Sequence, residues 1–153
     1  MNVFNLYDDE LDPPREHPGY TWRAVRVGEE LGAEKLGASL YELPPGQKTF
    51  PYHYESGAEE WLICIAGRPT LRTPDGEREL RLGDTVCFRD GPAGAHAVEN
   101  KTAEPARVLI LSTKGFPAIA IYPDSDKIGV WLSGGDSALF PRSAVVDYWE
   151  GES

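Results

Sequence analysis

The sequence is poor in the features that several large classes of protein require. Its 153 residues contain 15 Lys and Arg against 25 Asp and Glu, so it lacks the basic surface that binds a nucleic-acid backbone. No segment approaches the ~20 consecutive apolar residues of a membrane span. The N-terminal segment is acidic, whereas a secretory signal begins with positive charge and continues as an apolar stretch. We therefore expect a cytoplasmic protein that binds neither nucleic acid nor a membrane.

Cysteine and histidine are also scarce, with two and three residues respectively. Cys64 and Cys87 both lie inside apolar runs, and without a secretory signal they predict small buried side chains rather than a disulfide. His17 precedes a Pro-Gly pair and is expected in an exposed turn. Only His53 and His96 have neighbours that suggest a binding role.

Proline and glycine, by contrast, are frequent, with 13 and 16 residues that separate short runs rich in Val, Ile, Leu and aromatics. This pattern predicts an all-β sandwich or barrel formed by residues 20–153, preceded by a polar N-terminal arm of residues 1–19. Strands are expected near residues 20–27, 36–43, 48–55, 60–66, 69–73, 78–82, 85–88, 96–99, 107–112, 118–122 and 128–132. The segment from Ser143 predicts one short C-terminal helix with that serine as its N-cap.

Two histidines and two carboxylates are spaced so that they can meet. On a strand, His53 and Glu55 project from the same face, and Glu60 opens the next strand after a segment short enough to be a turn. His96 follows a Gly/Pro/Ala loop and begins a later strand. Imidazole and carboxylate donors together suit a divalent first-row metal ion, although the spacing alone is a weak signal.

These residues belong to a pattern that resembles the two sequence motifs of the cupins. The first motif corresponds to Gly46, His53, Glu55, Glu60 and Gly67, and the second to Gly83, Pro92-Ala93-Gly94, His96 and Asn100. The motifs cover residues 46–67 and 83–100, and the chain is similar to small single-domain bacterial cupins of unassigned activity. The resemblance implies a double-stranded β-helix (jelly-roll) barrel, with a divalent metal held by His53, Glu55, Glu60 and His96.

Glu55 stands where the cupin pattern has a second histidine. A Glu carboxylate reaches about as far from the backbone as a His Nε2 atom, so it remains a possible ligand. Two histidines and two carboxylates make a harder, formally neutral site with a divalent ion, which favours Zn, Mn or Fe(II) over copper. Glu59 is the alternative to Glu60, but a regular strand directs it to the opposite face.

Strand alternation also predicts the surroundings of the site. If Glu60 points inward, so do Leu62, Cys64 and Ala66, which form an apolar floor. Three large side chains then point outward, namely Trp61, Ile63 and Ile65. A domain of this size can cover them only with its N-terminal arm and C-terminal segment, so we expect a homodimer packed through sheet faces.

Two classes of function are compatible with these motifs. The first is a metalloenzyme acting on a small polar or anionic molecule, because isomerases, dioxygenases and decarboxylases all occur among similar cupins. Tyr41, Lys48, Arg72 or Arg89 would orient its substrate. The second is a non-catalytic ligand-binding or sensory cupin with a structural metal or none. The fold does not choose between them.

Overall fold

The computed structural model describes residues 1–152 and consists mainly of antiparallel strands. The strands are β1 (Arg23–Val25), β2 (Leu36–Leu43), β3 (Tyr54–Ser56), β4 (Glu60–Ala66), β5 (Thr70–Thr73), β6 (Gly76–Glu79), β7 (Thr85–Phe88), β8 (Ala97–Glu99), β9 (Ala106–Thr113), β10 (Ala118–Tyr122), β11 (Lys127–Trp131) and β12 (Ser137–Pro141). The helical segments are short: α1 (Val27–Glu30) and the 3-10 turns η1 (Pro92–Gly94), η2 (Pro123–Ser125) and η3 (Arg142–Ala144). None of the helices in residues 1–152 is long and apolar enough to cross a membrane.

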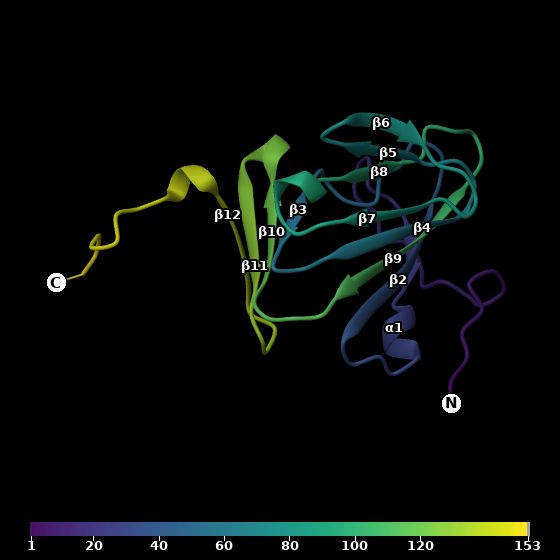
Figure 1. The fold of residues 1–153 in the computed structure, drawn as a ribbon, viewed down its shortest axis with the longest axis horizontal. Coiled ribbons are helices and arrows are strands. Elements are labelled where there is room, and N and C mark those ends of the chain that lie inside the picture. Colours follow the sequence, from purple (N-terminus) through teal and green to yellow (C-terminus); the bar gives the residue numbers. More distant parts are fainter. Residues whose placement is uncertain (153) are drawn as a thin grey trace.

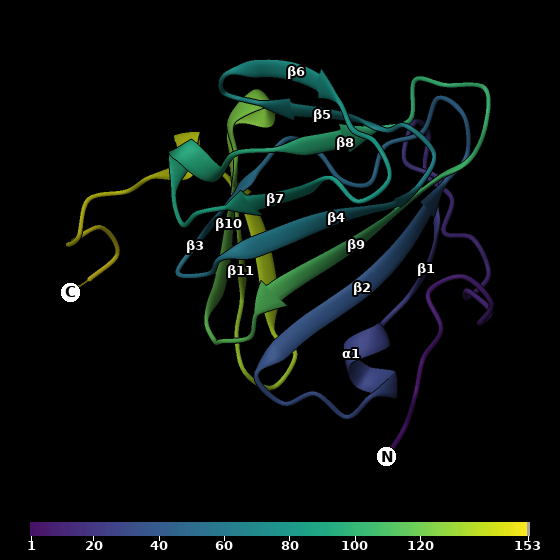
Figure 2. The same cartoon turned by 45° about the vertical axis from the view of Figure 1, so that its right-hand side comes forward.

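Three sheets build the barrel, and neighbouring strands are paired antiparallel throughout. The largest sheet has the order β1-β2-β9-β4-β7, and the others have the orders β12-β11-β10-β3 and β6-β5-β8. Figure 2 shows β2, β9, β4 and β7 side by side, with β5, β6 and β8 beyond β7. Consecutive strands are often not neighbours in a sheet, as the all-β jelly-roll prediction requires. The fold class expected from the sequence is therefore confirmed.

Two apolar clusters lie on opposite faces of the largest sheet. The inner cluster contains Leu62 and Cys64 of β4, whereas the outer cluster contains Ile65 and has Ile63 packed against it. β9 divides in the same way, since Val108 belongs to the inner cluster and its neighbour Leu109 to the outer one. The alternation predicted for β4 is thus observed. Both faces of β9 can carry apolar side chains, because each face is covered by one of the two clusters.

The N-terminal arm covers part of the outer cluster. Leu11 is buried in it, and Phe4 and Leu6 pack against it. Arg107 holds the arm by donating hydrogen bonds to the backbone oxygens of Leu6 and Tyr7, at 3.3 and 3.2 Å. The arm therefore supplies part of the cover that we expected from a second subunit.

Three details differ from the sequence-based expectations. Cys87 is exposed because it lies opposite Trp61 on the outer face of the β4–β7 pair, so the prediction of two buried cysteines is wrong for this residue. α1 and β12 were not anticipated, since each is short and weakly patterned. The expected C-terminal helix is only the 3-10 turn η3, which begins at Arg142 and has no side-chain cap.

The last strand is exposed, and the chain after it lies apart from the barrel. Every residue of β12 is exposed, and Figure 1 shows the chain after β12 running away from the body. Several large apolar side chains there are in contact with water, including Val145, Val146, Tyr148 and Trp149. This C-terminal arm, residues 142–152, makes no contribution to either apolar cluster.

Candidate metal centre

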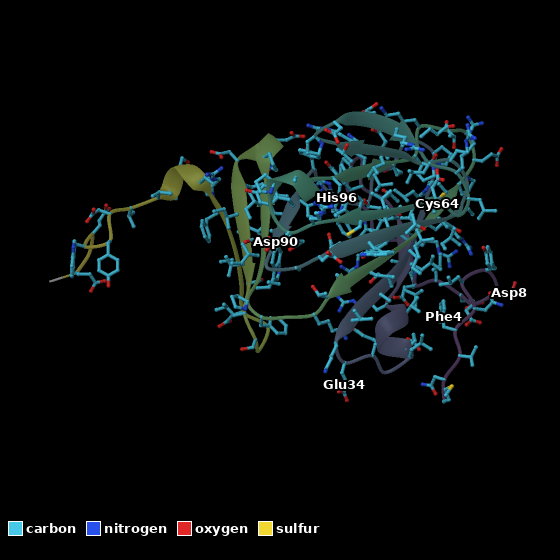
Figure 3. The ribbon with its side chains drawn as sticks, in the orientation of Figure 1. Phe4, Asp8, Glu34, Cys64, Asp90 and His96 are labelled. Carbon is cyan, nitrogen blue, oxygen red and sulfur yellow. The ribbon has the colours of Figure 1, made fainter. Side chains whose placement is uncertain are left out.

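Backbone pairing brings His53 and His96 together although 42 residues separate them in sequence. Their backbones form an isolated antiparallel bridge, in which His53 N donates to His96 O at 3.1 Å and His96 N donates to His53 O at 2.8 Å. The two imidazole rings are 4.7 Å apart between centroids. Figure 3 shows His96 among the side chains between the strands, nearer than Cys64 to the sheet that contains β10.

The loop before His96 has a shape that only glycine permits at one position. A Cβ atom on Gly94 would lie 1.9 Å from the backbone oxygen of Arg89. The preceding residues form the 3-10 turn η1, which begins with Pro92. The Pro-x-Gly part of the second motif therefore works through backbone packing, because it folds the loop tightly and delivers His96 to the bridge.

Each imidazole is oriented by its Nδ1 atom. His53 Nδ1 lies 2.8 Å from Pro51 O, and His96 Nδ1 lies 2.9 Å from Gly94 O. A carbonyl oxygen only accepts hydrogen bonds, so in each ring Nδ1 carries the proton and donates it. In the neutral imidazole Nε2 then keeps its lone pair. Backbone carbonyls that accept from Nδ1 impose the same arrangement on metal-binding histidines.

Glu60, the first residue of β4, completes a three-residue cluster with the histidines. Its Oε2 atom lies 3.6 Å from His96 Nε2, and one ligand atom from each of His53, Glu60 and His96 lies within 4.8 Å of the other two. Glu60 Oε2 is buried and has no hydrogen-bond partner within residues 1–152. A buried carboxylate oxygen without a partner is costly, and a divalent cation at this point would supply the missing interaction.

Glu55 lies beside this cluster rather than within it. It belongs to β3, where it pairs with Ala120 of β10, and its Oε1 atom lies 3.8 Å from His53 Nε2. The structure brings this fourth candidate to the same pocket, but its carboxylate is not one of the three mutually close ligand groups. Glu59 is exposed and directed outward, where its carboxylate accepts a hydrogen bond from Trp61 Nε1 at 3.2 Å.

Burial makes charge expensive at all four groups. It raises the pKa of Glu60 to about 7, an effect to which the nearby Glu55 adds, and it raises the pKa of Glu55 to about 7. Burial also lowers the pKa of His96 to about 4, and the pKa of His53 falls for the same reason. The imidazoles are therefore neutral and available as ligands near pH 7. The pair of buried carboxylates is suited to a cation that compensates their charge.

The cluster opens into a pocket of about 260 Å³. Hydroxyl groups contribute much of its wall, from Ser39, Tyr41, Ser112 and Tyr122. The ring of Tyr122 stacks on His53 at 5.8 Å between centroids, and Phe88 stacks on His96 at 3.7 Å. The pocket thus combines a candidate metal cluster with several hydroxyl groups that can bind a polar ligand.

The residues proposed to orient a substrate divide between three locations. Tyr41 lines the pocket beside the cluster. Lys48 and Arg72 line a different pocket, where Arg72 donates hydrogen bonds to both carboxylate oxygens of Asp124. Arg89 is exposed and lines none of the described pockets. Ser39, Ser112 and Tyr122 were missed because they lie outside both motifs, and no pattern in the sequence relates them to the histidines.

Comparisons with known proteins agree with this architecture. The Cupin_2 family model, described as a cupin domain, matches residues 39–112. A comparison with curated protein sequences finds no match. A solved sugar phosphate isomerase from a cupin superfamily, from Silicibacter pomeroyi, is similar with a TM-score of 0.82 and 24% identity, over 97% of this chain and 98% of that one.

Two further solved structures share the fold less completely. A Cupin 2 conserved barrel domain protein from Salinispora arenicola gives a TM-score of 0.56 and 23% identity, over 75% of this chain and 90% of that chain. The polyketide cyclase RemF from Streptomyces resistomycificus gives a TM-score of 0.59 and 20% identity, over 77% of this chain and 83% of that chain. At these identities the likeness concerns the fold, which serves proteins of different activity.

Proposed function

We propose that this chain, in which the cupin domain model matches residues 39–112, is a metal-dependent isomerase of a small polar molecule that carries hydroxyl and carbonyl groups. The observation that carries the proposal is the cluster of His53, Glu60 and His96 beside a hydroxyl-lined pocket. The sugar phosphate isomerase from Silicibacter pomeroyi, which has the same fold over nearly the whole chain, supports this choice among the reactions of cupins.

In this proposal His53, Glu60 and His96 hold a divalent ion, with Zn, Mn and Fe(II) as the candidates. A bound ion of this kind acts as a Lewis acid that polarises a carbonyl or hydroxyl oxygen of the substrate. The Nδ1 hydrogen bonds of both histidines to backbone carbonyls keep the rings in the orientation that presents Nε2. The apolar floor, which includes Leu62 and Cys64, excludes water beneath the cluster.

Glu55 has a separate role, which is to exchange a proton with the substrate. It lines the same pocket, lies next to His53 and is free of the three-residue ligand set. Its carboxylate takes a proton from the hydroxyl-bearing carbon beside the substrate carbonyl and returns it to the former carbonyl carbon, while the hydroxyl proton passes to the former carbonyl oxygen, so that carbonyl and hydroxyl exchange positions without any change in oxidation state overall. A general base must lie within reach of the proton that it abstracts, and the shared pocket allows this.

Metal analysis separates the two roles. The protein is purified without added metal, loaded with Zn, Mn or Fe(II) and examined by elemental analysis; we expect about one ion per chain. Glu60→Gln and His96→Ala should lose the ion, whereas Glu55→Gln should keep it. Glu59→Gln is the matched control, because Glu59 lies next to Glu60 but points outward. Loss of metal from Glu55→Gln would make Glu55 a ligand and contradict its assigned role.

Turnover is tested by proton exchange. Hexose and pentose phosphates are incubated with the loaded protein in D₂O, and proton NMR follows the signal of the hydrogen beside the carbonyl. Wild type should lose this signal through deuterium incorporation and form the isomeric sugar, and Glu55→Gln should do neither while retaining its metal. A loaded wild type that exchanges no substrate hydrogen would favour the non-catalytic, ligand-binding alternative.

We also infer that the chain acts as a homodimer. Two exposed apolar regions support a second copy as the partner: Trp61 on the outer face of β4, which is 44% exposed, and the C-terminal arm with Val146 and Trp149. Sedimentation should give twice the chain mass of 16.9 kDa. Trp149→Ser should shift the equilibrium toward monomer, whereas Leu82→Ser, on a lone exposed leucine, should not. A monomeric wild type would contradict the inference.

A further inference from the structure

The pocket beside the metal cluster continues beyond it into a longer groove. Two neighbouring pockets, of about 310 and 270 Å³, share residues with the cluster pocket. Ser39 and Tyr41 of β2 belong to the walls of all three. We refer to these three pockets together as the groove: Ser39 and Tyr41 are wall residues between the histidines on one side and β1 with the N-terminal arm on the other.

The far end of the groove is lined by two arginines and one carboxylate residue, Asp12. Arg15 comes from the N-terminal arm and Arg26 from the residue after β1, and both line the pocket that contains Tyr41. The backbone of Arg15 is fixed by a bridge to Trp22, with hydrogen bonds of 2.9 and 3.2 Å, and its guanidinium lies 5.6 Å from the centre of the Trp22 ring. A cation on the arm is thus held at a defined place in the groove.

Arg15 is exposed and, in the part of the chain that the structure describes, has no carboxylate partner, whereas six of the other nine arginines are paired with one. Within residues 1–152 no carboxylate oxygen lies within ion-pair distance of its guanidinium. Arg26 is paired with Glu29 at 2.9 Å, but both side chains are exposed, so the pair is weak and exchangeable. An arginine that lines a pocket and has no carboxylate partner leaves its guanidinium free to bind an anionic ligand.

Tyr41 connects the two ends of this groove electrostatically. Burial raises the pKa of its phenol, and among the smaller influences the positive charges of Arg26 and Arg15 lower it while the charge of Glu60 raises it. The phenol is therefore within electrostatic range of both the arginines and the metal cluster. The competing pocket, with Lys48 and Arg72, is less suitable because Asp124 already occupies both nitrogens of the Arg72 fork.

We propose that this groove binds the anionic group of the substrate, a phosphate or carboxylate, with Arg15 as the principal cation, Arg26 as the second, and Ser39 and Tyr41 as hydroxyl donors. The inference rests on the proposed function for the other end of the ligand, since the hydroxyl and carbonyl groups then face His53, Glu60 and His96. It assigns the substrate to the class of short sugars or polyols that carry a terminal anion.

Inorganic phosphate tests the anion site independently of catalysis. Its binding is measured by isothermal titration calorimetry on wild type and on His96→Ala, which is designed to lack the metal. Both should bind phosphate, and Arg15→Gln should weaken binding about tenfold or more, as expected for loss of a charge-assisted hydrogen bond. Arg26→Gln should have a smaller effect. Arg78→Gln, an exposed arginine of β6 outside the groove, is the matched control.

Three glucose compounds then identify the anion. Metal-loaded wild type is titrated with glucose, glucuronate and glucose 6-phosphate, which differ in the group at the end of the same sugar. Wild type should prefer one of the two anions over glucose, and Arg15→Gln should abolish that preference without changing metal content. The preferred compound distinguishes phosphate from carboxylate.

Failure of this inference is distinguishable from failure of the proposed function. Phosphate binding that is equal in wild type, Arg15→Gln and Arg78→Gln, or undetectable in wild type, would overturn the anion site even if the cluster binds metal. Conversely, Arg15-dependent phosphate binding in a protein that takes up no metal would uphold the anion site and overturn the proposed isomerase.

Discussion

Large apolar side chains are buried in the barrel but exposed in β12 and the C-terminal arm. In the barrel, Leu62 and Val98 are completely buried, and the sheets pack apolar groups on both faces of β9. In β12 and the arm that follows, Leu139 is 55% exposed and Trp149 is 71% exposed. The barrel is a closed unit whose stability depends on its own packing. The arm is joined to the body through Arg142, whose backbone N donates to Asp126 O at 2.8 Å, but it adds no side chain to either apolar cluster and is suited to contact another molecule.

The largest expected difference between the two regions comes from shortening a leucine. Leu62→Ala should lower the free energy of unfolding by about 3 kcal/mol, because it removes buried apolar contacts and leaves a cavity in the inner cluster. Leu139→Ala, on exposed β12, should change it by less than about 0.5 kcal/mol. Urea denaturation at matched protein concentration measures both. Equal effects would show that β12 is packed as firmly as the barrel.

A smaller difference is expected for buried and exposed asparagine. Asn100, which is fully buried, donates from Nδ2 to the backbone oxygens of Leu43 and Glu104 and accepts hydrogen bonds from Thr102. Asn100→Ala should cost about 2 kcal/mol, because it leaves the buried backbone oxygen of Leu43 without that donor. Asn5→Ala should cost less than about 1 kcal/mol, since the hydrogen bonds of Asn5 are exposed to water. Thermal unfolding distinguishes these outcomes, and a milder effect at Asn100 would argue against its buried role.

The N-terminal arm should fall between these extremes. Phe4 is only half-buried against the outer cluster, so Phe4→Ala should reduce the free energy of unfolding by about 1 kcal/mol. Metal content should not change, because the outer cluster lies on the other face of the sheet from the histidines. Hydrogen exchange would show faster exchange in the arm alone. Faster exchange throughout β4 and β9 would instead mean that the arm is part of the barrel's cooperative unit.

Much of the barrel was predictable because its strands are short and bounded by glycine and proline. The observed β2, β4 and β7 have the expected bounds, and the turn residue Asn100 has the turn role that its position suggests. The motif resemblance proposed Glu60 as a ligand, alternation then put Glu59 on the opposite face of the strand, and Glu60 does line the pocket. The exposed Cys87 was missed, since an apolar run does not reveal which face of a strand will be covered.

Local sequence patterns and long-range packing therefore account for different features of this protein. The all-β class, the alternation of β4 and the occurrence of histidine with carboxylate in two motifs can be read from the amino-acid order, because they depend on backbone periodicity and residue chemistry within short windows. The bridge between His53 and His96, the position of Glu55 outside the three-residue cluster and the position of Arg15 in the pocket lined by Tyr41 emerge from the folded chain. These features depend on contacts between distant segments, and no local pattern specifies which of them meet.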